Sequence, residues 1–104
     1  MVTLSEIREF TYDRQSNFRD IDKRLLDLTV HKFFDASNER VIDYDLVSYV
    51  SNSKLRVDVY DRVAIINLAL DRLLGEDNHY FEELLYENSF ENMRDLTSHV
   101  ITWF

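Results

Sequence analysis

Residues 59–75 read Val-Tyr-Asp-Arg-Val-Ala-Ile-Ile-Asn-Leu-Ala-Leu-Asp-Arg-Leu-Leu-Gly, and they carry the strongest structural pattern in the chain. Apolar side chains recur there at spacings of four, three, four and three residues, which is the period of one face of an α-helix. The positions are Val59, Val63, Ile66, Leu70 and Leu73. More apolar residues lie between them, and position 75 is a glycine, the residue that most often closes a helix in the left-handed conformation. The pattern predicts a buried central helix that ends at Gly75.

The tripeptide Tyr60-Asp61-Arg62 in this stretch also occurs 48 residues earlier, as Tyr12-Asp13-Arg14. Identities at the same offset include Ser5 with Ser53, Arg8 with Arg56, Arg24-Leu25-Leu26 with Arg72-Leu73-Leu74, His31 with His79, and Phe33 with Phe81. An offset of 50 aligns residues 45–50 with residues 95–100. Unrelated residues would match roughly one time in fifteen. The identities therefore predict an internal duplication, with repeat one at about residues 2–50 and repeat two at about residues 51–104, packed about a pseudo-twofold axis.

We interpret the repeated tripeptide as structural. Its tyrosine can pack at the edge of the core while its aspartate and arginine bind across a helix turn or to the other half.

The composition favours helices. The chain of 104 residues has no proline and one glycine, although turns and hairpins normally use both residue types. Residues 18–34 repeat apolar side chains at spacings of three and four, which predicts a second amphipathic helix. With 45% hydrophobic residues the chain can bury a sizeable core. We predict a single all-α domain over residues 1–104, made of two tandem helical repeats.

Residues 41–50 allow two interpretations. Ile42, Tyr44 and Leu46 alternate as in a strand, whereas the apolar residues that follow fit a helix. The equivalence to residues 95–100, which have helical spacing, favours the helix, and a short strand stays an alternative.

Short polar side chains mark the expected helix starts. Thr3 can cap the first helix, with Glu6 completing a capping box. A serine of Ser51-Asn52-Ser53 can cap the next long helix, and Asp77 and Ser89 can cap the two shorter ones after it.

The chain is strongly acidic, with 20 Asp and Glu residues against 12 Lys and Arg and a formal net charge of −8. This charge disfavours direct binding to nucleic acid and to anionic lipid, because both would be repelled. No apolar run in the sequence is long enough to cross a membrane, and Glu6, Arg8 and Glu9 interrupt the apolar residues near its start. We expect a soluble, cytoplasmic protein.

Residues 76–91 contain six carboxylates and neither Lys nor Arg, which makes them the candidate protein-binding surface. The candidate residues are Glu76, Asp77, Tyr80, Glu82, Glu83, Tyr86, Glu87 and Glu91. Such a run is either a solvated helix face or a surface that receives a basic partner. In the second case the tyrosines anchor the complex and the carboxylates steer the target.

No catalytic set, cofactor motif or phosphate loop is recognisable in the sequence. We therefore predict a non-catalytic interaction module that binds a protein with a basic surface. It would act as an inhibitor or regulator, and as a nucleic-acid mimic if its target is a nucleic-acid enzyme.

Arg94 and His99 enclose the four residues Asp-Leu-Thr-Ser. This arrangement resembles the arginine-histidine motif of the HEPN ribonucleases. The resemblance implies a toxin in which the arginine stabilises a phosphorane and the histidine transfers a proton, both from near one helix face. A third alternative is a structural homo-oligomer, such as a homodimer, that buries Trp103 and Phe104 between its subunits.

Residues 33–46 resemble an EF-hand loop, because Asp35, Ser37 and Glu39 alternate as calcium ligands do. Arg40 stands where that loop needs glycine, and Leu46 stands where it needs its last carboxylate. We therefore predict no metal site there.

Overall fold

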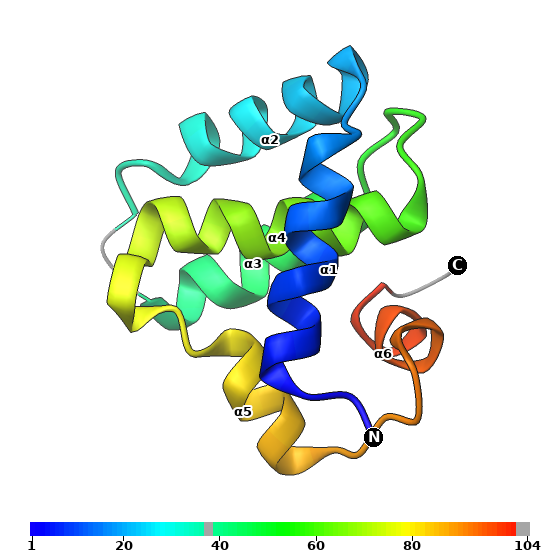
Figure 1. Ribbon diagram of the computed structural model, residues 1–104. Helices are drawn as coiled ribbons and strands as arrows, with labels where there is room; N and C mark the ends of the chain where they lie inside the picture. Colours follow the sequence, from blue (N-terminus) through cyan, green and yellow to red (C-terminus); the bar gives the residue numbers. More distant parts are fainter. Residues whose placement is uncertain (37–38, 102–104) are drawn as a thin grey trace.

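Six α-helices and one 3-10 turn form the regular structure in the described part of the chain (Figure 1). The computed structural model describes the backbone of residues 1–36 and 39–101, and the side chains of residues 1–36 and 42–101. The elements are α1 (Leu4–Ser16), α2 (Asp20–Phe33), α3 (Glu39–Ser51), α4 (Val59–Leu74), η1 (Gly75–Asp77), α5 (Tyr80–Glu87) and α6 (Met93–Val100). The all-α prediction is confirmed. Because α3 covers residues 41–50, the strand alternative for that segment is wrong.

Helix α4 is the centre of the fold, as its sequence predicts. Figure 1 shows it crossing the middle of the molecule, with α1 passing over it and α2 running alongside. It packs against α1, α2, α3 and α6, and every residue from 61 to 70 is buried. Gly75 follows it with φ +58° and ψ −124°. The positive φ suits glycine, but this ψ lies outside the left-handed helical region, so the predicted left-handed cap is wrong.

The start of α4 differs from the prediction. The helix begins at Val59, and the side chain of Asp58 accepts a hydrogen bond of 2.8 Å from the backbone N–H of Tyr60. Ser53 instead lies in the loop between α3 and α4, where its hydroxyl accepts from the N–H of Leu55. This loop is held by Arg62, whose guanidinium donates to four backbone carbonyls. The acceptors are those of Val50, Ser53, Leu55 and Val57.

Two other predicted caps are also wrong. Helix α5 begins at Tyr80 after His79, because Asp77 is used in the 3-10 turn η1. Helix α6 begins after Asn92, whose side chain accepts from the N–H of Asp95 at 3.0 Å, so Ser89 lies too early to cap it. Thr3 does cap α1 as predicted, accepting from the N–H of Glu6 at 3.2 Å.

The structure does not confirm the pseudo-twofold repeat. An offset of 48 residues moves α1 onto residues 52–64, which are part loop and part α4. Tyr12-Asp13-Arg14 accordingly lies near the end of α1, whereas Tyr60-Asp61-Arg62 lies at the start of α4. Identical tripeptides therefore sit at opposite ends of non-equivalent helices.

A chain of polar side chains, which runs from the core to the surface, holds the segment that leads into α5. Asn67 of α4 donates to the hydroxyl of Thr11 on α1 at 3.0 Å, and its side-chain oxygen accepts from Asn78 at 3.3 Å. Asn78 also donates to Asp71 at 2.6 Å. Because Asn78 comes two residues before Tyr80, these bonds set the position from which α5 leaves the core.

Candidate protein-docking surface

Helix α5 has two different faces. Tyr80, Phe81, Leu84 and Leu85 pack into or against the hydrophobic core. The opposite face, which we call the α5 outer face, consists of Glu82, Glu83, Tyr86 and Glu87, all exposed. Apolar side chains at spacings of one, three and four residues place one stripe inward, and the carboxylates are left on the other side.

The α5 outer face is negatively charged. Glu82 and Glu83 lie in the first turn of the helix, where negative charge is favoured by the partial positive charge of the helix N-terminus. The ring Nδ1 of His79 lies 3.1 Å from Glu82 Oε2. These side chains together with Tyr86 and Glu87 line a shallow, open depression. The only basic side chain in that lining is therefore a histidine.

Tyr86 is the most exposed large hydrophobic side chain of the described chain, at 93%. It lies between Glu83 and Glu87 in sequence and on the same face of the helix. An aromatic ring so placed contributes little to the stability of the fold, but it can bury a large area in a complex.

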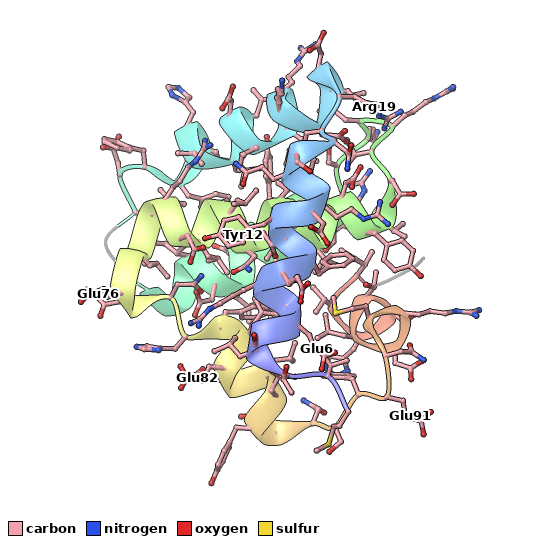
Figure 2. All side chains as sticks on the ribbon, viewed as in Figure 1. Glu6, Tyr12, Arg19, Glu76, Glu82 and Glu91 are labelled. Atoms are coloured by element: carbon pink, nitrogen blue, oxygen red, sulfur yellow. The ribbon has the colours of Figure 1, made fainter. Side chains whose placement is uncertain are left out.

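The predicted site residues do not all share this face. Figure 2 shows Glu76 and Glu82 toward one edge of the molecule and Glu91 toward another. Glu76 and Asp77 are exposed on η1, ahead of α5. Glu91 is exposed in the segment between α5 and α6.

Tyr80 also departs from the predicted surface, because it faces α3. Its ring packs edge-to-face on Phe81 with centroids 5.0 Å apart. Burial, together with the negative charge of Asp43, raises the pKa of Tyr80 to about 12. The spacing of Tyr80 to Leu84 is the inward period of α5, so the sequence already carries the signal that separates Tyr80 from the glutamates.

A partly buried charge cluster lies where α1, α2 and α4 meet, and sequence analysis predicted only its pair between the two halves. Arg14 of α1 lies 3.2 Å from Asp61 of α4 and 3.6 Å from Asp58, the residue that caps α4. Asp22 of α2 is fully buried and accepts from the backbone N–H of Arg19 at 2.7 Å. Burial raises the pKa of Asp61, and the charge of Asp22 adds to the rise, whereas Arg14 opposes it. The cluster joins three helices, which indicates a structural role.

Arg94 and His99 both lie on α6 with exposed side chains. Residues five apart on an α-helix are about 140° apart around its axis. The prediction that the two side chains lie near one helix face is therefore wrong. The ring of His99 packs against that of Phe90, with centroids 5.3 Å apart. Within the described residues, no hydrogen bond or ion pair joins Arg94 to His99. Trp103 and Phe104, on which the oligomer alternative depends, lie outside the described residues.

Comparison with protein-family models, with curated proteins and with solved structures found no match to this chain. In the described ranges, no three or more His, Cys, Asp or Glu side chains are grouped so as to hold a metal ion. Residues 33–46 are only partly described, because the side chains of residues 37–41 lie outside those ranges. Among the described helices none is both long and apolar enough to cross a bilayer. The function must therefore be inferred from the geometry of the chain itself.

Proposed function

We propose that this chain is a non-catalytic, cytoplasmic interaction protein that docks on a basic protein surface through the α5 outer face. It acts there as an inhibitor or regulator. The observation that supports the proposal is Tyr86, an aromatic side chain that is 93% exposed and flanked by glutamates.

The carboxylates and the tyrosine would contribute to binding in different ways. Glu82, Glu83 and Glu87 raise the encounter rate with a positively charged surface, and this effect weakens as salt screens the charges. Tyr86 then supplies buried contact area at a low entropic cost, since its side chain has few rotatable bonds.

Glu76 and Asp77 extend the negatively charged surface beyond the α5 outer face. Both are exposed on η1, directly ahead of α5 in the chain. A basic groove that normally holds a nucleic-acid backbone would meet a comparable series of negative charges here. If the partner is a nucleic-acid enzyme, the chain competes with its nucleic acid.

The test is affinity capture from cell lysate at low salt with the wild-type chain and with the triple variant Glu82→Lys, Glu83→Lys, Glu87→Lys. The expected result is a basic protein that the wild type retains, that elutes as salt rises, and that the variant does not retain. Tyr86→Ala is expected to weaken capture without changing its salt dependence.

A matched control separates the α5 outer face from net charge alone. Glu9→Lys, Asp20→Lys, Asp45→Lys changes the charge by the same amount at exposed positions on α1, α2 and α3. This control should retain the partner. Loss of capture in both triple variants, or capture that ignores salt, would contradict a specific docking face.

A further inference from the structure

One end of the molecule is positively charged, although the chain as a whole is acidic. Figure 1 shows the start of α2 and the loop between α3 and α4 together at the upper right. Arg19 of α2 joins the two segments, because its guanidinium donates to the carbonyl of Arg56 at 3.2 Å. Three exposed cations on these segments, which we call the basic end, are Lys23, Lys54 and Arg56.

The side chains of the basic end are available to a partner. They make no hydrogen bond or ion pair within the part of the chain that the structure describes. Two nearby carboxylates are already paired, Asp22 with Arg19 at 3.4 Å and Asp58 with Arg14 at 3.6 Å. Asp20, exposed at the start of α2, offsets one of the three cations. The basic end therefore keeps a net positive charge.

The basic end complements the α5 outer face. Three exposed glutamates flank Tyr86 on α5, and the cations Lys54 and Arg56 flank Leu55, a partly buried apolar side chain. Glutamates pair with lysine and arginine, and a tyrosine ring packs on an apolar side chain or stacks on a guanidinium. The chain thus carries on its own surface the kind of basic surface that its α5 outer face is proposed to bind.

The two surfaces lie too far apart to meet within one copy of the chain. Helix α5 is at the bottom of Figure 1, on the other side of α4 from the start of α2. Figure 2 separates Glu82 from Arg19 in the same way. A contact between copies therefore joins two different surfaces head to tail, and it leaves one of each surface open for a further copy.

We propose that the α5 outer face of one copy binds the basic end of a second copy, and that this contact regulates access to the α5 outer face. The inference rests on the proposed docking function, because a copy bound on that face excludes the basic partner. Exposed ion pairs contribute little each, so the contact is weak and transient. A partner with a more extensive basic surface displaces the second copy.

The test uses the purified full chain without any partner. Sedimentation velocity follows its weight-average mass from about 10 μM to about 1 mM at about 0.02 M salt, where charges act over roughly 20 Å. We expect the mass to rise with concentration. At about 0.5 M salt, which screens the charges, the mass should return to that of a single chain.

A pair of charge-reversal variants identifies the two surfaces. The α5 variant is Glu82→Lys, Glu83→Lys, Glu87→Lys, and the basic-end variant is Lys23→Glu, Lys54→Glu, Arg56→Glu. Each variant alone carries the same charge on both surfaces, so its self-association should be at least about tenfold weaker than that of the wild type. An equal mixture should associate again, because each surface then meets the opposite charge. The net charge changes from −8 to −2 and −14, respectively, so attraction between net charges does not explain this recovery.

A third variant controls for net charge. Glu9→Lys, Asp45→Lys, Glu91→Lys changes the charge as the α5 variant does, at exposed positions outside both surfaces. It should self-associate as the wild type does. Four results would overturn the contact: a monomeric wild type at low salt, association that ignores salt, no recovery in the mixture, or loss of association in this control.

The capture experiment separates this contact from the proposed function. The basic-end variant keeps the α5 outer face and should capture the basic partner at least as well as the wild type. Positive capture with a monomeric chain rejects the contact between copies alone. Self-association that recovers in the mixture, combined with failed capture, rejects the basic partner and leaves the contact between copies.

Discussion

The first Tyr-Asp-Arg tripeptide lies near the end of α1, where Tyr12 and Asp13 are exposed, whereas the second opens α4 with Asp61 and Arg62 buried. A twofold arrangement would pair each aspartate with the arginine of the other copy. Only one such pair forms, between Arg14 and Asp61 at 3.2 Å. Arg62 instead binds backbone carbonyls of the loop before α4. The same three residues therefore serve different purposes because the two helices contribute opposite ends to the core.

The largest expected difference between the copies is at the arginines. Arg62→Met should lower the free energy of unfolding by about 3 kcal/mol, because it leaves three loop carbonyls and the carbonyl of Val50 in α3 without their donor. Arg14→Met, the matched substitution, should cost about 1 kcal/mol, since it removes two partly exposed ion pairs, to Asp61 and Asp58. Urea unfolding followed by circular dichroism measures both values. Equal losses would contradict the distinct roles of the two copies.

A smaller and pH-dependent difference is expected at the aspartates. Because the pKa of Asp61 is raised in the folded state, the folded chain binds more protons at this group than the unfolded chain does. Its contribution to stability is therefore complete below the ordinary pKa of 3.8 and is lost as the pH rises through the raised value.

The comparison that isolates this effect is wild type against Asp61→Asn in urea unfolding from pH 3.5 upward. Relative to the variant, the wild type should lose stability as the pH rises. A constant difference in stability between the wild type and Asp61→Asn at every pH would show that burial does not disturb the pKa of Asp61.

The helices could largely be predicted from apolar spacing, because a period of three to four residues is a direct consequence of helix geometry. The residues that cap the helix starts were harder to predict, because short polar side chains are frequent in this chain and only tertiary packing selects among them. Asp58 and Asn92 cap where Ser53 and Ser89 were expected, and the loop held by Arg62 explains the first shift.

The candidate surface was predictable only in part. Glu82, Glu83, Tyr86 and Glu87 come together because they share one side of α5. Glu91 separates from them because the chain turns away after Glu87. The position of Tyr80 beside α3 depends on contact between segments about 30 residues apart, and spacing along the sequence carries no signal for such a contact. The buried Asp22 and Asp61 depend on tertiary packing in the same way.

The most direct measurement of the docking claim compares two exposed tyrosines that lie on different helices. A photoreactive benzoylphenylalanine replaces Tyr86 on α5 in one sample and Tyr12, which is 68% exposed on α1, in the other. Each is irradiated in lysate at low salt and analysed by mass spectrometry. The account predicts that position 86 cross-links to one basic protein, that rising salt abolishes the product, and that position 12 gives none. Equal cross-linking from both positions, or none from position 86, would contradict it.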